Sequence, residues 1–144
     1  MQEIEVTARS AADPGAVYRL LLDGARWPEC SPLGSFELER PGETEREGIG
    51  AIRVFTTGTV KSREQVVEAV PGRRFGYVLL SGLPLVGYRA DLLLTPDGDG
   101  TVISWRSRFR PRYTGTGWLF RLFLGGVIRR LVAGLAATAG APRT

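Results

Sequence analysis

The sequence predicts an α+β fold in which a curved, seven-stranded antiparallel sheet wraps around one long C-terminal helix. The first observation is the segment 113–139, the longest apolar stretch, which has hydrophobic residues at helical spacing. The second is a series of segments between residues 35 and 109 that alternate apolar and polar residues and are separated by short turns. A twisted sheet that has only one long helix to cover it curls around that helix.

The N-terminal part predicts one strand followed by two short helices. Residues 3–8 alternate as a strand does. Asp13 before Pro14 indicates a helix start, with the carboxylate expected as the N-cap, and Gly24 is expected to end this helix. A second short turn or helix holds Trp27.

Six further strands are expected at 35–40, 49–57, 59–69, 74–81, 88–95 and 101–109. Because short turns join them, strands that follow one another in the chain are expected to be antiparallel neighbours. The acidic loop 41–48 is expected to be exposed. The apolar loop 81–87 indicates a gate over an interior space, a dimer contact or packing on the sheet, and these alternatives stay open.

The C-terminal helix is expected to bury one apolar stripe: Leu119, Leu122, Phe123, Val127, Leu131 and Leu135. The apolar arc is wider than on an ordinary surface helix, which suggests contact on more than one side, and the residues that widen it are Trp118, Phe120, Leu124, Ile128 and Val132. At roughly 1.5–3 kcal/mol for each large apolar side chain that becomes buried, this helix would supply a dominant share of the core. Arg121, Arg129 and Arg130 interrupt the apolar run, so we expect no transmembrane segment.

The composition excludes several classes of site. With 144 residues the chain fits a single domain over 1–144. It contains no histidine, which excludes Ser-His-Asp and Cys-His catalysis and histidine-ligated metals. Its one cysteine, Cys30, cannot form an internal disulfide, and the N-terminus lacks the features of a signal peptide. We therefore expect a cytoplasmic protein with no metal and no cofactor.

The chain is basic, with 19 Lys and Arg against 15 Asp and Glu. Arg106, Arg108, Arg110 and Arg112 alternate, so in a strand they share one face. This face indicates either an anionic partner, such as nucleic acid or a lipid surface, or a solvated outer surface. No nucleic-acid motif or interleaved aromatic platform accompanies it, so we expect no nucleic-acid partner.

Taken together, the chain resembles the START-like (SRPBCC) superfamily, specifically its polyketide cyclase/dehydrase-like branch. The resemblance rests on residues 4–29, 48–55 and 64–109 and on the C-terminal helix, which together cover nearly the whole chain. It implies the helix-grip fold, with a largely apolar cavity between sheet and helix. Members of the superfamily include lipid carriers, hormone receptors, quinone-binding proteins, aromatases and cyclases, so the resemblance alone does not choose a function.

Strand alternation predicts which side chains face this cavity, because every second residue points inward. With Gly58 in the turn, antiparallel pairing brings Arg53 opposite Ser62 to Glu64 and predicts a buried or half-buried Arg53–Glu64 ion pair. The residues expected to contact a ligand are Trp27, Phe36, Arg53, Phe55, Glu64, Tyr77, Leu79, Tyr88, Ala90, Trp105, Ser107, Trp118, Leu122 and Phe123.

Three functions remain open. The first is binding of a small hydrophobic molecule, such as a lipid, quinone, polyketide or aromatic metabolite. The second is a polyketide cyclase, aromatase or dehydratase, in which Arg53 stabilises an enolate, Glu64 orients Arg53, and Tyr77 or Tyr88 moves a proton. The third is a surface or protein-interaction module that uses the arginine face. Each candidate residue could also be purely structural, and either a monomer or a homodimer fits the sequence.

Overall fold

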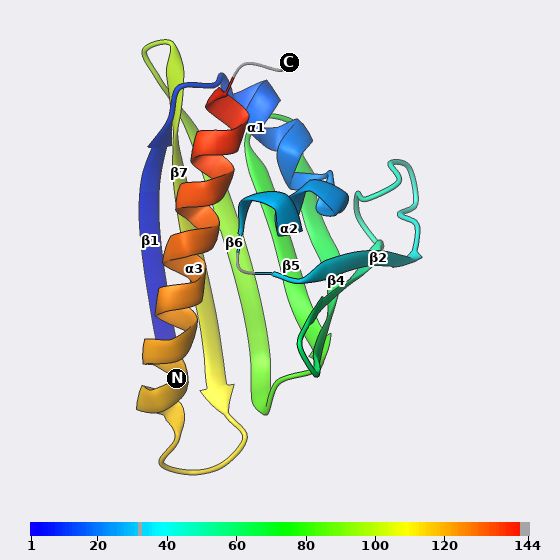
Figure 1. Cartoon of the computed structure of the whole chain (residues 1–144), viewed down its shortest axis with the longest axis vertical. Helices are drawn as coiled ribbons and strands as arrows, with labels where there is room; N and C mark the ends of the chain where they lie inside the picture. Colours follow the sequence, from blue (N-terminus) through cyan, green and yellow to red (C-terminus); the bar gives the residue numbers. More distant parts are fainter. Residues whose placement is uncertain (32, 142–144) are drawn as a thin grey trace.

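The computed structural model describes residues 1–31 and 33–141, apart from the side chain of Cys30, so the expectation for that thiol lies outside the described part. The elements are β1 (Gln2–Ser10), α1 (Pro14–Leu21), η1 (Gly24–Arg26), α2 (Trp27–Cys30), β2 (Ser35–Arg40), β3 (Ile52–Thr57), β4 (Val60–Val70), β5 (Arg74–Ser81), β6 (Leu85–Asp97), β7 (Gly100–Pro111) and α3 (Gly117–Gly140). One seven-stranded antiparallel sheet has the order β1-β7-β6-β5-β4-β3-β2. Figure 1 shows α3 running along one face of this sheet, with α1 and α2 beside it. The predicted fold class is confirmed.

The strands bury alternate residues, as the sequence pattern predicts. In β7, Ile103, Trp105, Ser107 and Phe109 are buried, whereas Arg106 and Arg108 between them are exposed. In the central hairpin, Arg53 pairs with Glu64 across β3 and β4. The face of the sheet toward α3 is therefore mostly apolar and buried, with Arg53 and Glu64 as buried charged residues, and the opposite face carries the exposed charges.

The first helix begins where predicted, at Pro14 after Asp13, but it differs from its prediction in the capping role of Asp13 and in where it ends. Asp13 occupies the N-cap position in an extended conformation, but its side chain makes no capping hydrogen bond. Instead, the Asp13 carbonyl accepts a hydrogen bond from Val17 N at 3.1 Å. The helix ends at Leu21, and Gly24 opens η1. A Cβ at Gly24 would overlap the Phe36 ring and the Glu47 carboxylate, so close packing explains this glycine.

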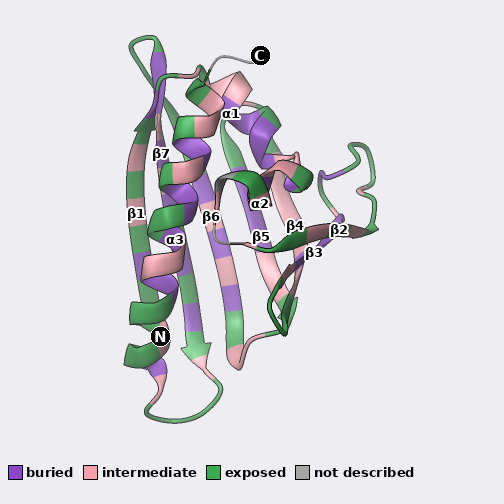
Figure 2. Cartoon of the chain, viewed as in Figure 1, coloured by how far each residue is buried: buried purple, intermediate pink, exposed green. Residues whose placement is uncertain are grey.

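The buried face of α3 is not the predicted stripe. The buried apolar side chains are those of Leu124, Ile128, Leu131, Val132, Leu135 and Ala136. Of the predicted stripe, only Leu131 and Leu135 are buried and Val127 is half-buried, whereas Leu124, Ile128 and Val132 belong to the wider apolar arc that was also expected. Leu119, Leu122 and Phe123 are exposed. Figure 2 shows the first turns of α3 as mostly exposed and the later turns as buried along one side. Apart from Arg121, apolar residues lie on nearly every side of the first turns of α3, so their spacing did not identify the buried side.

By length and composition, α3 could also span a membrane, with a mean hydropathy of 1.5 over its most apolar window. In the structure it packs against β1, β7 and α1, and 39% of that window is buried. The expectation of no transmembrane segment, which rested on three arginines, stays a prediction.

Candidate ligand-binding cavity

A cavity of about 460 Å³ lies between the sheet and α3. The sheet and the segments beside it contribute Trp27, Leu33, Thr57, Val60, Ser62, Glu64, Tyr77, Leu79, Leu83, Tyr88 and Trp105 to its lining. Helix α3 contributes Phe123, Leu124, Val127, Ile128, Arg130 and Leu131. Most of these side chains are apolar. The volume is in the range that encloses a drug-sized organic molecule.

Burial distinguishes the two ends of the cavity. Thr57, Val60, Phe123 and Arg130 are exposed and mark where the cavity opens to solvent, which we call the mouth. Leu83 stands beside them in a loop of only three residues, because β6 already begins at Leu85. The loop expected at 81–87 is thus shorter than predicted, and Leu83 is its contribution to the cavity.

At the end of the cavity away from the mouth, which we call the buried end, polar groups form a hydrogen-bonded row. The hydroxyls of Tyr77 and Tyr88 lie 3.4 Å apart, and the Tyr88 hydroxyl lies 2.9 Å from Ser107 Oγ. Trp105 Nε1 donates to the same Ser107 oxygen at 3.0 Å. Burial raises the pKa of both tyrosines, so both hydroxyls stay neutral. The two hydroxyl–hydroxyl bonds of the row use two of its three hydroxyl hydrogens, so one hydrogen is left to donate to a ligand oxygen.

Glu64 is the titratable carboxyl on the cavity surface and is only 8% exposed. Burial raises its pKa to about 7, and the positive charge of Arg53 counteracts only part of this effect. Glu64 Oε1 accepts no hydrogen bond from any described residue, and the nearest Arg53 nitrogen is 4.0 Å away. Near neutral pH this carboxyl can therefore either donate or accept a hydrogen bond.

Arg53 lies behind the cavity wall rather than on it. Its Nη1 donates to the Leu21 carbonyl at 2.7 Å and to Glu47 Oε1 at 3.3 Å. Its guanidinium carbon lies 4.5 Å from the ring centre of Trp27 and 5.0 Å from that of Phe75. Arg53 is not among the residues that line the cavity, so its expected ligand contact and its enolate role stay predictions that the cavity geometry does not support. Arg53 makes two ion-pair contacts, with Glu47 at 3.3 Å and with Glu64 at 4.0 Å, so the expected pairing with Glu64 is present as the longer of the two.

Glu47 is the important residue that the sequence reasoning missed. It lies in the acidic loop expected to be exposed, yet it is buried. Its Oε1 accepts hydrogen bonds from Gly24 N at 2.8 Å and from Arg53. Nothing distinguishes it from its acidic neighbours in the sequence, because only the folded chain brings it to Arg53.

The structure brings half of the expected ligand contacts to the cavity: Trp27, Glu64, Tyr77, Leu79, Tyr88, Trp105 and Phe123. Phe55, Ala90 and Ser107 are buried in the wall behind these residues. Phe36 packs against Phe55, with ring centres 5.4 Å apart. The expectations for Trp118 and Leu122 are wrong, because both are exposed on the side of α3 turned away from the cavity.

Ten cavity residues are absent from the expected set, and five of them come from α3: Leu124, Val127, Ile128, Arg130 and Leu131. A correct choice of the helix face would have found them. Leu33, Leu83 and the hairpin residues Thr57 and Val60 lie in or next to turns, where alternation gives no inward direction.

Comparisons with known proteins agree with this architecture. Residues 1–140 match the family model described as polyketide cyclase / dehydrase and lipid transport. No curated protein is similar enough in sequence to match. A START superfamily protein from Mycobacterium smegmatis superposes with a TM-score of 0.80 at 13% identity, covering 93% of this chain and 94% of that one.

Two further solved structures show the same fold. A protein from Thermobifida fusca has a TM-score of 0.79 at 24% identity, covering 97% of this chain and 94% of that chain. Norcoclaurine synthase from Thalictrum flavum, solved in complex with dopamine and hydroxybenzaldehyde, has a TM-score of 0.72 at 15% identity, with 94% and 84% covered. At these identities the likeness concerns the fold alone. With its family match over 1–140, the chain belongs to the polyketide cyclase / dehydrase and lipid transport family and has a START-like fold.

Proposed function

We propose that this protein binds a small, mostly apolar molecule in the cavity between the sheet and α3. The observation that carries the proposal is a cavity of about 460 Å³ whose lining is apolar except for a few polar groups, three of them gathered at the buried end. Apolar walls give affinity by removing hydrocarbon from water, and a few fixed polar groups give orientation.

The polar groups specify what the buried end of the ligand must carry. Tyr77 and Tyr88 offer neutral hydroxyls, and Glu64 offers a carboxyl that is free of hydrogen bonds to described residues at one oxygen. A carbonyl, phenol or alcohol oxygen fits this set, whereas a second carboxylate would be repelled by ionised Glu64. The candidates are therefore lipids, quinones, polyketides or aromatic metabolites that bear such an oxygen.

The test is a cavity-filling substitution with a matched control. Val127→Trp adds a large side chain to the cavity wall, whereas Ala133→Trp adds the same group on the exposed side of α3. Native mass spectrometry of each purified protein would report a retained ligand, and calorimetry would measure the binding of a naphthoquinone, a long-chain alcohol and a flavonoid.

We expect Val127→Trp to weaken binding about tenfold or more, since the added ring occupies space that the ligand needs, and Ala133→Trp to bind as the unchanged protein does. Circular dichroism would establish that both variants fold. Equal affinities in two folded variants, or no bound molecule with any probe and none retained after purification, would refute the proposal.

A second candidate, a cyclase or dehydratase acting on a poly-ketone, is favoured by the pKa of about 7 at Glu64. Acid–base groups move protons most effectively when their pKa is close to the working pH. Ionised Glu64 would remove a proton beside a carbonyl, and Tyr77 or Tyr88 would donate to the developing enolate oxygen, the role first expected of Arg53. In this role Glu64→Gln should lower turnover of a model poly-ketone by about 10² or more while keeping its affinity. Unchanged turnover would exclude it.

A further inference from the structure

The start of α3 and the loop before it expose a group of large apolar side chains. Tyr113 is 60% exposed, Trp118 63%, Leu119 52%, Leu122 65% and Phe123 59%, and we call these five residues the apolar tip. Trp118 and Leu122 are one helical turn apart, as are Leu119 and Phe123, so the four helical members form one continuous surface. Exposed apolar patches of this kind usually mark a surface that contacts something else.

The charge near the tip is almost entirely positive. The chain contains no Asp or Glu from residue 100 to its end. Arg110 and Arg112 lie where β7 leads to the tip, and Arg121, Arg129 and Arg130 lie on α3. Within the described part of the chain none of these five makes an ion pair, whereas Arg106 and Arg108, farther along β7, pair with Glu3, Glu5 and Asp91.

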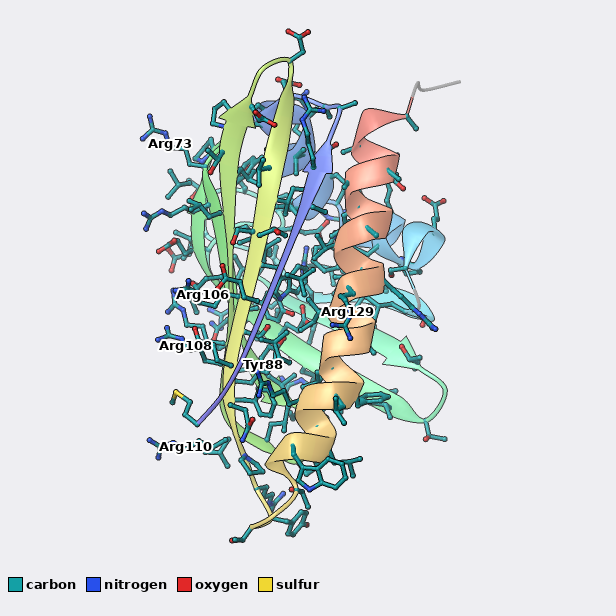
Figure 3. The ribbon with its side chains drawn as sticks, turned by 90° about the vertical axis from the view of Figure 1, so that its left-hand side faces the viewer. Arg73, Tyr88, Arg106, Arg108, Arg110 and Arg129 are labelled. Atoms are coloured by element: carbon teal, nitrogen blue, oxygen red, sulfur yellow. The ribbon has the colours of Figure 1, made fainter. Side chains whose placement is uncertain are left out.

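Figure 3 shows this distribution from the side. Arg106, Arg108 and Arg110 follow one another along the outer face of the sheet toward the end where α3 begins, while Arg129 projects from the helix. Glu3 and Glu5 line the β1 side of a groove that includes Trp118 and Leu122, but Arg106 already holds both carboxylates. An anionic surface that approaches the tip would therefore first meet Arg110, Arg112 and Arg121, which make no ion pair in the described part of the chain, and Arg129 and Arg130 lie about two helical turns farther along α3.

These observations favour an anionic lipid bilayer over a second copy of the chain. Two copies joined through their tips would bring like-charged arginines together, which costs free energy. A bilayer instead accepts tryptophan, phenylalanine and leucine at the level of its headgroups, and anionic lipids attract the surrounding arginines. Phe123 belongs to both the tip and the cavity mouth, so docking there would place the mouth beside the lipids.

We propose that the apolar tip docks this protein onto anionic membrane surfaces, with Trp118 and Leu122 inserted at the headgroup boundary and the arginines on lipid phosphates. This inference does not depend on the identity of a cavity ligand. It adds a membrane site to the binding function proposed above.

The experiment is co-sedimentation of the full chain with vesicles, comparing phosphatidylglycerol mixed with phosphatidylcholine against phosphatidylcholine alone. The apolar variant is Trp118→Ser with Leu122→Ser, neither of which lines the cavity. Its control is Val70→Ser with Leu93→Ser, two exposed apolar residues that flank Arg74 in the sheet. The charge variant is Arg121→Gln with Arg129→Gln, and its control is Arg73→Gln with Arg74→Gln at the opposite end of the molecule (Figure 3).

We expect the unchanged protein to bind the anionic vesicles far more than the neutral ones, and the binding to weaken as salt is added. Removing two tip arginines should weaken binding on the order of tenfold. The serine variant at the tip should lose binding to a similar or greater extent, and both controls should keep it. Retention of a cavity ligand in native mass spectra should be the same in the tip variants as in the unchanged protein.

Three results would overturn the proposal. One is binding that does not depend on anionic lipid, and another is an equal loss in the tip variants and their controls. The third is a stable dimer in sedimentation equilibrium that the Trp118→Ser, Leu122→Ser variant dissociates, because the tip would then be covered by a second copy. A loss of vesicle binding with cavity binding intact separates this site from the ligand-binding function.

Discussion

Arg53 and Glu64 illustrate how two residues that pair in the sequence analysis acquire different roles in the fold. Arg53 is held by the Leu21 carbonyl and Glu47, so it joins α1 and the loop before β3 to the sheet. Glu64 faces the cavity, and its Oε1 accepts no hydrogen bond from the described residues. A buried acceptor without a donor is costly. Arg53 is thus part of the framework, and Glu64 is the member of the pair that a ligand can reach.

The raised pKa of Glu64 predicts how stability depends on pH. The folded protein keeps the Glu64 proton up to about pH 7, whereas the unfolded chain releases it near the ordinary value of 4.5. The free energy of unfolding should therefore fall as pH rises from about 4.5 to 7. The total cost above this window is up to about 3 kcal/mol. Glu64→Gln, which cannot ionise, should lose this part of the pH dependence.

Urea unfolding of both proteins at pH 5 and pH 8 would measure the effect, because the remaining titratable groups are common to the two. The difference in free energy of unfolding, Glu64→Gln minus the unchanged protein, should be more positive at pH 8 than at pH 5. The same pH dependence in both proteins would show that Glu64 ionises normally in the fold.

At the residue scale, prediction from the sequence depended on periodicity. The alternation of β3 and β4 gave the Arg53–Glu64 pairing, because a turn at Gly58 fixes the register. The same reasoning could not find Glu47, which lies among other acidic residues in a loop without a repeating pattern. Its burial depends on where the loop lies after the sheet and α1 have come together.

At the scale of elements, α3 combines two different surfaces in one helix. Its later turns bury Ile128, Val132 and Leu135 against the sheet and α1, while its first turns expose Trp118 and Leu122. The sequence predicted the existence and extent of the helix well. It did not predict the buried face, because apolar residues lie on most sides of the helix, and contact with β1 and β7 determines which of them become buried.

This division predicts opposite outcomes for two similar substitutions. Leu135→Ala should lower the free energy of unfolding by about 2–5 kcal/mol, because it leaves a space in a fully buried contact. Leu122→Ala should change it by less than about 0.5 kcal/mol, since that side chain is mostly in solvent. Both changes introduce a good helix former, so helix propensity does not account for the difference.

Chemical denaturation followed by circular dichroism would measure both variants. Comparable losses at the two positions would mean that the first turns of α3 are packed more tightly than the structure shows. A near-neutral Leu135→Ala would mean that the later turns are packed less tightly.

At the scale of the whole molecule, most of the sheet order follows from short turns, since these join β3 to β7 in sequence order, whereas the longer loop 41–51 joins β2 to β3. β1 is different, because α1 and α2 separate it from β2 and no turn fixes its place. The structure pairs β1 with β7, with Ile4 opposite Ser107, so the first and the last strand of the chain lie side by side. The cavity volume was equally beyond prediction, because it is the space that side chains from every element leave unfilled.

Because one end of the cavity is enclosed and the other opens to solvent, the cavity constrains the two ends of a ligand differently. Glu64, Tyr77 and Tyr88 lie at an enclosed end, whereas Val60 and Phe123 stand at an end that opens outward. A molecule anchored by its oxygen at the closed end would leave any surplus hydrocarbon projecting through the opening. The affinity would then depend strongly on the oxygen-bearing group at the closed end and only weakly on the length of the hydrocarbon chain. Homologous compounds that differ only in chain length would share one binding pose.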